Sequence, residues 1–530
     1  MCGIWTIAKK KGFFQKNPQI KDFWSIKNRG PDISSIKEIS TKNFNLWLGF
    51  HRLSIIDITS NSNQPFIINK KNKTFIFICN GEIYNYKYLI QKYNLEESGD
   101  CKVLLNLIIK YPQKWKFMLD YEIKGEFAFV CYEIHNNNLH KIIVGRDQVG
   151  IRPLYYVKEK FIFSSEIKGI SNYSNVKEFP PGIVKEININ LNYINEYSFQ
   201  WIYRIKQIQS QEEKYLYDIV RAVKKSINLR LFADKPIGFL LSGGVDSSLV
   251  CAIATYFLRI PINTFCIGIE NTGTDFTFAR SVAKKIKSNH KEVFFTTEDA
   301  INALPEIIYA TETYDTTTIR ASIGQFLLAK YIKENTDIKV ILVGEGPDEV
   351  CSSYLFNWNC PNEKELHKTA IEYVKKIHHF DVRRVDRCLS YFGLEARVPL
   401  LDPSFIKAYW KIPQELRMPQ YKGIEKWWLR KAFEKYDILP NNVLWRKKEA
   451  FSDGISSTSN PLHVMIQDFC GNFFNESSSL NAENKYYKHI YDGFFKNINT
   501  IPHYWQPKWH EHCNTNLIDP SARILAAYNN

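Results

Sequence analysis

The sequence predicts two domains: an α+β N-terminal half made of β-sheets with flanking helices, and an α/β C-terminal half built on a doubly wound parallel sheet with additional helices. Three observations support this prediction. The chain has 530 residues, which is long for a single hydrophobic core. Up to about residue 205 it consists of short runs rich in β-branched and aromatic residues. Beyond that point, helical segments alternate with short apolar strands. We therefore place the domains at 1–205 and 206–530.

The N-terminal half reads as strands separated by turn residues, with two helices between them. The "NNN" at 136–138 predicts a hairpin turn between two of the strands. Helices are predicted at 86–93 and 101–115 from their apolar periodicity. Strands are predicted at 44–56, 74–81, 125–134, 141–147, 153–165 and 182–190.

The C-terminal half contains three short apolar segments that predict parallel strands: "PIGFLL" at 236–241, "NTFCIGI" at 263–269 and "IKVILVG" at 338–344. From about residue 365 the pattern is mainly helical. The segment after residue 455 is polar and less periodic, and its pattern predicts no definite structure or role.

Composition excludes several classes of protein. The net charge of +15 comes from lysines scattered through Asn- and Ile-rich stretches, with no basic stripe and no nucleic-acid motif, so we expect no nucleic-acid partner. No apolar run is long enough to cross a bilayer, and no membrane partner is expected. The eleven cysteines include no C-x-x-C pair, which is typical of reduced thiols in a cytoplasmic protein.

The stretch "PIGFLLSGGVDSSLVCAIATYFL" predicts a strand, a glycine turn and a helix. Ser242, Gly243 and Gly244 can present successive N–H groups to an anion at the helix N-terminus. The turn lacks the lysine of a P-loop and carries Asp246, which suits phosphate only if Mg²⁺ lies between the two. The alternative is a structural turn whose aspartate is favoured by the helix dipole.

Two more strand ends should meet this turn, because ligands bind at the carboxyl ends of parallel strands. Asp275 follows one strand, and Glu345, Asp348 and Glu349 follow another in "GEGPDE". Acids at these places could simply cap helices. Beside a phosphate-binding turn they are better interpreted as metal and proton-transfer groups.

The opening "MCGIW" places a thiol where the amino terminus will be once Met1 is removed, which we expect because Cys2 is small. Nucleophile and base would then share one residue, since an α-amine has a pKa of about 7.7–8 and can accept the thiol proton. A buried structural cysteine is the alternative interpretation, and "MC" alone would favour it.

Other residues of this half favour catalysis. Asn80 and Gly81, in "CNGEIYNY", offer a side-chain amide and a backbone N–H for an oxyanion hole. Arg52 suits a carboxylate, and Asp100 and Glu82 suit an ammonium group. Together these residues describe an amino-acid pocket beside a thiol that hydrolyses an amide.

At this point the chain resembles the glutamine-dependent asparagine synthetases over nearly all its length. The matching strings of the first half resemble a class II glutamine amidotransferase and imply an Ntn-hydrolase-like sandwich: "MCGIW", "RGPD", "GFHRLSIID", "NQPF", "NGEIYN", "GEFAF", "GRDQVGIRPLYY", "FSSEIK" and "FPPG". Those of the second half resemble a PP-loop ATP pyrophosphatase domain: "GFLLSGGVDSSL", "ETYDTTTIRAS", "GEGPDE", "GLEARVPLLD", "EKWWLRKAF", "LWRKKEAFSDG" and "DPSAR".

The resemblance implies that glutamine, aspartate and ATP are substrates, with Mg²⁺, and that asparagine forms through β-aspartyl-AMP. In the N-terminal domain it makes Cys2 the nucleophile, with Asn80 and Gly81 as the oxyanion hole. Glutamine would be held by Arg52, Glu82, Asp100 and the same oxyanion residues. Ammonia would cross to the second site through a tunnel that we expect to be lined by apolar residues. A homodimer is implied by the resemblance alone.

In the C-terminal domain the resemblance makes Glu345 the base for ammonia attack and Lys448 the group that stabilises phosphate charge. Asp246 and Asp348 would hold the metal, and Thr317, Thr318, Arg320 and Asp348 would bind or activate aspartate. Without the resemblance, Lys448 would be a solvated lysine and Arg320 a helix-surface arginine. The residues that would bind ATP are Leu240, Leu241, Ser242, Gly243, Gly244, Asp246, Ser247, Ile267, Val343, Gly344 and Glu345.

Four positions depart from the family pattern. Val343 replaces a serine near the nucleotide, which predicts a lost hydroxyl contact to ATP. Ser352 and Ser353 replace glycines in "CSSY", and serine would strain a turn that needs positive φ. Pro347 fixes φ and removes an N–H. Because the acids are retained, we predict that synthetase activity survives with changed substrate affinities.

Two rival functions keep much of this pattern. A β-lactam synthetase would share the architecture, but those enzymes lack an intact N-terminal nucleophile, and Cys2 is present here. A glutaminase or scaffold with a degenerate ATP site is supported only by "CSSY". The retained charges of Asp246, Glu345 and Lys448 count against it, because an unused site loses costly clustered charges easily.

Overall fold

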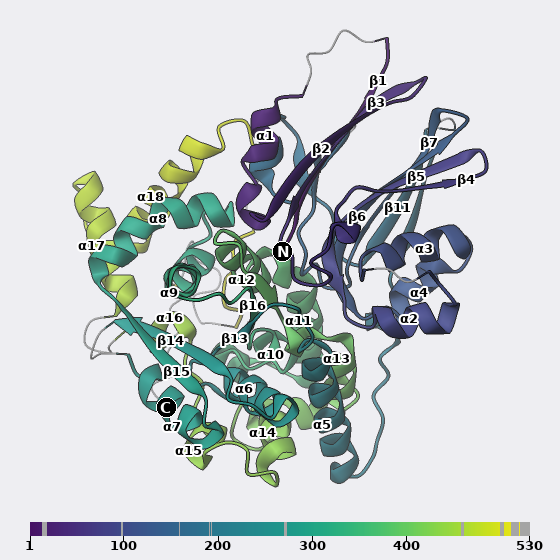
Figure 1. The fold of residues 1–530 in the computed structure, drawn as a ribbon. Helices are drawn as coiled ribbons and strands as arrows, with labels where there is room; N and C mark the ends of the chain where they lie inside the picture. The colour runs from purple at the N-terminus through teal and green to yellow at the C-terminus, as the bar shows by residue number, and fades with distance from the viewer. Residues whose placement is uncertain are drawn as a thin grey trace.

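The computed structural model describes residues 1–12, 18–96, 99–157, 160–189, 191, 193–269, 273–456, 461–498, 503–509 and 519. Of the C-terminal "DPSAR" string only Asp519 belongs to the described residues. The chain folds into two sheet-based parts that contact each other along a broad surface (Figure 1).

The N-terminal part contains two antiparallel six-stranded sheets, with strand orders β10-β8-β9-β1-β3-β2 and β12-β11-β7-β6-β5-β4. The first sheet consists of β1 (Gly3–Lys10), β2 (Ile33–Ser40), β3 (Phe44–Arg52), β8 (Tyr155–Val157), β9 (Phe161–Ser164) and β10 (Val176–Glu178). The second consists of β4 (Phe66–Lys70), β5 (Lys73–Ile83), β6 (Gly125–His135), β7 (Asn138–Arg146), β11 (Ile183–Asn188) and β12 (Tyr193–Ser198).

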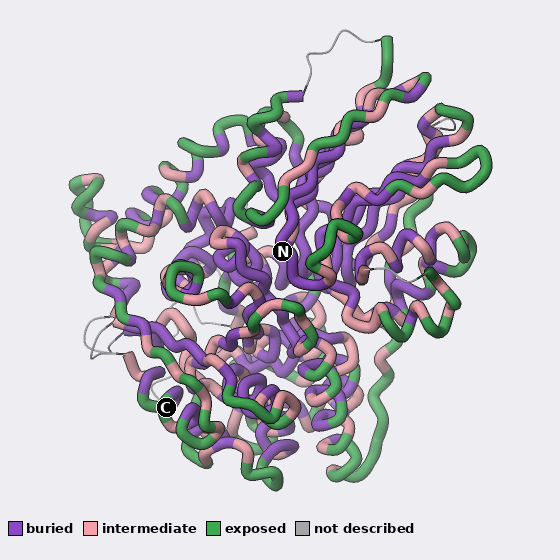
Figure 2. The backbone as a smooth tube through the Cα atoms, in the orientation of Figure 1, coloured by how far each residue is buried: buried purple, intermediate pink, exposed green. Residues whose placement is uncertain are grey.

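Side-chain alternation explains the packing of these sheets. Ile76 and Ile78 of β5 lie in a core with Leu46 and Leu48 of β3, between the sheets. The intervening Phe77 faces the other side, toward helices α2, α3 and α4. Figure 2 shows buried residues along the inner strands, whereas the edge strands β2 and β12 are largely exposed. The predicted sandwich with flanking helices is confirmed.

The predicted helix 101–115 is two helices, α3 (Lys102–Lys110) and α4 (Trp115–Tyr121). Pro112 separates them, because proline has no N–H to donate and disfavours helical backbone in the residue before it. The predicted strand 153–165 is similarly divided into β8 and β9. The hairpin turn predicted at 136–138 joins β6 to β7, with Asn136 and Asn137 at positive φ.

The C-terminal part is built on a parallel sheet of order β15-β14-β13-β16-β17. Its strands are β13 (Ile237–Leu240), β14 (Asn263–Ile269), β15 (Asn289–Phe295), β16 (Val340–Leu342) and β17 (Glu395–Arg397). The chain leaves the central strand β13 in one direction and later returns to its other side. The doubly wound prediction is confirmed, and the switch point beside β13 is where such sheets bind ligands.

Helices surround this sheet and continue to the C-terminal region. Helices α17 and α18 pack together and against α8, so the segment that showed no clear periodicity is helical over part of its length. The remaining helices are α1 (Ile20–Trp24), α2 (Tyr86–Tyr93), α5 (Glu212–Leu229), α6 (Val245–Leu258), α7 (Asp275–Ile286), α8 (Thr297–Thr311), α9 (Thr316–Asn335), α10 (Pro347–Val350), α11 (Glu363–Lys376), α12 (Asp381–Ser390), α13 (Pro403–Trp410), α14 (Trp427–Glu434), α15 (Asn441–Leu444), α16 (Phe451–Gly454), α17 (Leu462–Phe474) and α18 (Leu480–Phe494).

The proposed domain boundary at 205/206 lies between β12 and α5. In the part of the chain that the structure describes, no helix combines the length and the apolar character needed to cross a membrane.

Candidate active sites

The N-terminal site forms where β1 begins beside β5. The backbone N–H of Cys2 donates to Asn80 Oδ1 at 3.0 Å. Asn80 is fully buried, and its Nδ2 has no hydrogen-bond partner. The Cys2 thiol lies 3.9 Å from the Leu53 carbonyl oxygen, and burial raises the pKa of Cys2 to about 11. The residue that carries the thiol therefore contacts a residue with an unused amide donor.

Met1 occupies the space next to this thiol. It is 1% exposed, and its α-amine lies 3.7 Å from Glu395 Oε2. Burial lowers the pKa of this amine. Removal of Met1 would leave the new α-amine of Cys2 at the position where its N–H now contacts Asn80.

The remaining predicted glutamine-binding residues surround this point. Gly81 lies on β5 against β6, where an added Cβ would be 2.5 Å from the Glu126 carbonyl oxygen. Asp100 Oδ2 accepts from the Ile83 N–H at 2.9 Å, and burial raises the pKa of Asp100 to about 6. Glu82 faces the other domain, with Oε2 3.6 Å from Arg397 Nη2. Burial raises the pKa of Glu82 well above its usual value.

Arg52, at the end of β3, holds the loop that follows it. Its Nη1 donates to the Thr59 carbonyl oxygen at 2.6 Å and to Asn63 Oδ1 at 2.7 Å. Its Nη2 donates to the Asp57 carbonyl oxygen. In this arrangement the guanidinium is engaged by the protein, so carboxylate binding would require it to exchange some of these contacts.

The second site begins at the turn between β13 and α6. Gly243 has a φ of +75°, and an added Cβ would lie 2.5 Å from Phe278, so glycine is required there. Ser247 Oγ accepts from the Ser242 N–H at 3.3 Å. An added Cβ at Gly344 would lie 2.6 Å from the Ser247 nitrogen, which shows how closely the β16 end approaches this turn.

A cavity of about 160 Å³ lies over this turn. Of the predicted ATP-binding residues, Leu240, Leu241, Ser242, Gly244, Asp246, Ser247, Ile267, Gly344 and Glu345 line it, as do Asp348 and Lys448. Gly243 shapes the turn beneath it. Val343 does not line the cavity; it is 1% exposed in the core, and its N–H donates to the Arg397 carbonyl oxygen at 3.1 Å.

Two lysines form ion pairs with two of the predicted acids. Lys426 Nζ contacts Asp246 Oδ2 and lies 2.6 Å from Asp348 Oδ1. Lys448 Nζ lies 2.7 Å from Asp348 Oδ2. These two lysines hold the pKa of Asp348 well below its usual range, although burial opposes that shift. Lys426 was not predicted as a site residue; its signal was a lysine within the "EKWWLRKAF" string.

The carboxylates suit Mg²⁺, whose preferred protein ligands are carboxylate oxygens. Asp246 Oδ1 is buried and has no hydrogen-bond partner, so one carboxylate oxygen is available to the ion. Lys426 and Lys448 pair with the other oxygens of Asp246 and Asp348. The donor set therefore fits Mg²⁺, which would have to displace these lysines from the carboxylates.

Glu345 lies at the opposite wall of the cavity. Its Oε1 accepts from Gln325 Nε2 at 3.2 Å and lies 3.5 Å from Arg384 Nη1. Burial raises the pKa of Glu345, while Arg384 acts in the opposite direction. Neither Gln325 nor Arg384 was identified from the sequence, and both line the cavity.

Three of the four residues predicted to bind or activate aspartate lie outside the cavity lining. Asp315 caps α9, and its Oδ2 accepts from the Thr318 N–H at 2.9 Å and from Thr318 Oγ1 at 2.6 Å. Arg320 points toward the C-terminal segment, where it donates to Glu483 at 2.8 and 2.5 Å and to Asp519 at 2.7 and 3.0 Å. Thr317 Oγ1 is buried without a hydrogen-bond partner. None of Thr317, Thr318 and Arg320 is among the residues that line the cavity.

The departures from the family pattern have distinct local effects. Pro347 is the first residue of α10, where its missing N–H has no helical partner to lose. Ser352 has a φ of +53°, and its buried hydroxyl has no partner. Ser353 Oγ donates to Asp348 Oδ1 at 2.5 Å. The strain predicted for serine therefore falls on Ser352, while Ser353 gains a contact with a cavity carboxylate.

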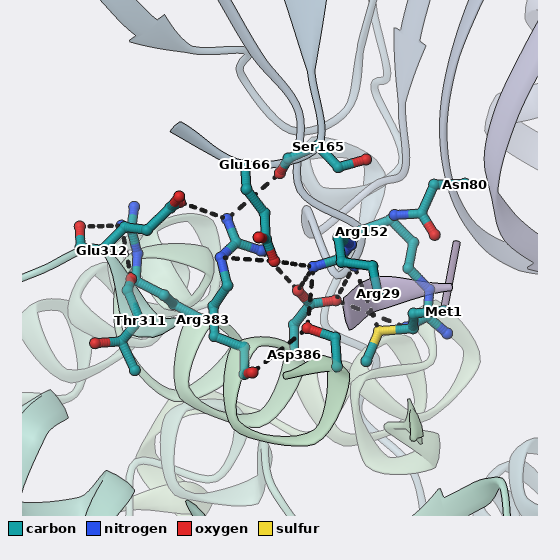
Figure 3. Close-up of polar contacts among 12 residues, drawn as sticks. Met1, Arg29, Asn80, Arg152, Ser165, Glu166, Thr311, Glu312, Arg383 and Asp386 are labelled. Carbon is teal, nitrogen blue, oxygen red and sulfur yellow. Dashed lines mark hydrogen bonds and ion pairs between the residues drawn. The ribbon is translucent and has the colours of Figure 1, made fainter. Parts of the chain in front are cut away.

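A buried ionic network lies between the two sites (Figure 3). Arg29 Nη1 lies 2.8 Å from both Glu166 Oε1 and Asp386 Oδ2, and Arg29 Nε donates to the Cys2 carbonyl oxygen at 3.0 Å. Arg152 Nη2 donates to the Ala396 carbonyl oxygen at 3.0 Å. This region is strongly charged next to Cys2, and the expectation that apolar residues line a tunnel between the domains stays a prediction.

One further group of potential metal ligands occurs within the described residues. Glu178, His378 and His379 bring ligand atoms within 4.8 Å of one another at the domain interface. However, Arg146 and Arg383 each place a guanidinium nitrogen 2.9 Å from Glu178. These positive charges oppose a cation, so we interpret the group as an interdomain ion-pair cluster.

Comparisons with known proteins agree with both halves. The profile of a family described as glutamine amidotransferase domain matches residues 1–209, and that of asparagine synthase matches residues 218–360 and 357–512. A probable asparagine synthetase [glutamine-hydrolyzing] of Acanthamoeba polyphaga mimivirus is 37% identical, covering 94% of this chain and 95% of its own. Asparagine synthetases [glutamine-hydrolyzing] of Cricetulus griseus and Homo sapiens are 35% and 34% identical, covering 100% of this chain and 99% of theirs. The chain belongs to the asparagine synthase family and carries an N-terminal glutamine amidotransferase domain.

Proposed function

We propose that this chain converts L-aspartate to L-asparagine with ammonia released from L-glutamine. ATP is cleaved to AMP and diphosphate, and glutamate is the second product of the nitrogen transfer. Family membership across both domains supports glutamine-dependent asparagine synthesis. The finer assignment of β-aspartyl-AMP as the intermediate is supported by the phosphate-binding turn and its paired acids.

The observation that carries the proposal is the contact between Cys2 and Asn80. It places a thiol beside an amide whose Nδ2 is buried and unused. In the proposed reaction the thiolate attacks the glutamine side-chain amide, and the oxyanion is bound by Asn80 Nδ2 and the Gly81 N–H. The α-amine of Cys2 accepts the thiol proton and later protonates the leaving ammonia.

Substrate glutamine is oriented by charge. Arg52 binds its α-carboxylate, and Asp100 with Glu82 binds its α-ammonium group. Burial raises the pKa of Asp100 to about 6 and also raises that of Glu82, so both acids lose their charge more readily than ordinary carboxylates as the pH falls. A bound ammonium group stabilises their ionised forms.

In the synthetase half, the N–H groups of the turn at residues 242–247 bind phosphate, and Lys448 neutralises charge that develops on it. Mg²⁺, when bound to Asp246 and Asp348, would offset the negative charge of diphosphate. Glu345 accepts a proton from ammonia as its nitrogen attacks the activated aspartyl carbon.

Thr317, Thr318 and Arg320 receive an indirect role in this proposal. Thr318 contacts Asp315 and Arg320 contacts Glu483, so these two residues fix the start of α9, and Thr317 belongs to the same first turn. That helix carries Gln325, which does line the cavity.

The test supplies aspartate, ATP and Mg²⁺ with amide-labelled glutamine as the only nitrogen donor. Labelled asparagine and AMP in equal amounts are expected. Glutamate without asparagine or AMP would contradict the proposal and leave only the amidotransferase half active. An amidated acceptor other than aspartate would indicate the related β-lactam-type chemistry.

A further inference from the structure

Gln325 makes two complementary hydrogen bonds at the edge of the cavity. This side chain on α9 is 1% exposed. Its Nε2 donates to Glu345 Oε1 at 3.2 Å, and its Oε1 accepts from Arg384 Nη1 at 3.4 Å. The amide therefore bridges a carboxylate and a guanidinium that are themselves 3.5 Å apart.

The chemistry of an amide suits this position. Its NH₂ group can only donate and its carbonyl oxygen can only accept, so the two neighbours fix which way the side chain points. Gln325 itself is almost fully buried, whereas the Glu345 side chain is 16% exposed at the cavity. An apolar side chain of similar length would leave Glu345 with Arg384 as its nearest remaining donor.

The other charges that face Glu345 come from α12. Arg384 favours its ionised form, whereas Asp381 opposes it, and the neighbouring Cys388 thiol is buried. Asp381 Oδ1 also lies 3.1 Å from Arg384 Nη2, so this guanidinium is shared between two acids. Because Arg384 is shared between Glu345 and Asp381, we expect a second hydrogen-bond donor to Glu345 to have a measurable effect on the reaction.

We propose that Gln325 is a positioning residue that aims the Glu345 carboxylate into the cavity and keeps it ionised for proton transfer from ammonia. The inference rests on the proposed role of Glu345 as the base. A hydrogen bond to the charged form of an acid lowers its pKa, so loss of the Gln325 donor should raise that of Glu345.

The test compares Gln325→Met with the wild type in ammonia-dependent asparagine formation from pH 5.5 to 9, at saturating aspartate and ATP. The ratio of variant to wild-type rate cancels the protonation of ammonia itself. We expect the acid limb of the variant to move up by about one pH unit, a tenfold loss on that limb, with rates converging at high pH. Leu327→Met, on the same helix and outside the cavity, is the control and should follow the wild type.

The outcomes separate this inference from the proposed function. A loss that is equal at all pH values, or a profile that coincides with the wild type, would overturn the inference. If Gln325→Met does not fold, Gln325→Glu decides, since a second carboxylate beside Glu345 should shift the limb further upward. Glu345→Gln serves as the reference: normal synthesis in that variant would remove Glu345 as the base, and the inference with it. An inactive Glu345→Gln variant with an unshifted Gln325→Met profile would remove the inference alone.

Discussion

The two sites of this molecule are built in different ways. The amidotransferase site takes Cys2, Asn80 and Gly81 from the start of β1 and the end of β5, and it holds a buried donor, Asn80 Nδ2, without a partner, which in the proposed function binds the oxyanion. The synthetase site is assembled from elements that are far apart in the sequence, and lysines already neutralise its acids. In the proposed function, the first site supplies a hydrogen-bond donor to the oxyanion that forms during the reaction. The second site pairs its own carboxylates with lysines before its charged substrates bind.

The largest expected effect comes from removing the nucleophile, which tests whether the two sites act separately. Cys2→Ala should reduce glutamine-dependent asparagine formation by about a thousandfold or more, because the thioester cannot form. Ammonia-dependent formation should remain close to wild type, since the second site is separate. Both rates are measured in the same preparation. An equal loss with both nitrogen donors would refute the separation of the two sites.

A second change tests the charge balance of the synthetase site. Lys426→Met leaves Asp246 and Asp348 facing each other without their shared cation, and truncating one partner of a buried ionic group destabilises by about 3–5 kcal/mol. AMP formation should fall by about a hundredfold while glutaminase activity persists. Lys431→Met is the control, because this partly exposed lysine lies within α14, the helix that Lys426 precedes. Unchanged AMP formation in Lys426→Met would show that the bridge is dispensable.

The pH dependence of glutamine use tests how the amidotransferase site binds the ammonium group of glutamine. Burial raises the pKa of Asp100 to about 6, so its carboxyl group takes up a proton as the pH falls through that value. The neutral form cannot pair with the glutamine ammonium group. Glutaminase kcat/KM should therefore fall by up to about tenfold per pH unit below 6, mainly through KM. A kcat/KM that stays flat to pH 5 would separate Asp100 and Glu82 from ammonium binding.

How far each site could be predicted follows from its construction. Cys2, Asn80 and Arg52 stand in short strings whose residue types already indicate their chemistry. Lys426 and Gln325 do not, because a lysine beside tryptophans and a glutamine within a helix acquire a role only when the fold brings them to Asp348 and Glu345.

Helix geometry explains why Arg320 contacts the C-terminal region and does not line the cavity. Successive helical residues turn by about 100°, so Arg320 lies roughly opposite the face shared by Thr318 and Gln325. Its guanidinium therefore meets Glu483 on α18. Runs of β-branched and aromatic residues predicted many of the strands, but the strands not identified are β1, β2, β4, β10, β12, β15 and β17. Of these, β17 is only three residues long and depends on pairing with β16.

The smallest expected effect concerns the two serines beside the cavity. Ser352 occupies a left-handed position just after α10, where a residue other than glycine destabilises the folded state by about 1–2 kcal/mol, and its buried hydroxyl is unpaired. Ser352→Gly removes this strain, but glycine also gives the unfolded chain more freedom, which costs about 0.4–1 kcal/mol. The free energy of unfolding in urea should therefore rise by about 1 kcal/mol. Ser353→Gly is the matched control, and it should weaken the protein and its AMP formation, because it removes the hydrogen bond to Asp348. A destabilised Ser352→Gly variant would mean that the turn is not strained. An inactive wild type restored by glycine at both positions would instead show that these two serines, and not the acids beside them, decide whether the synthetase site works.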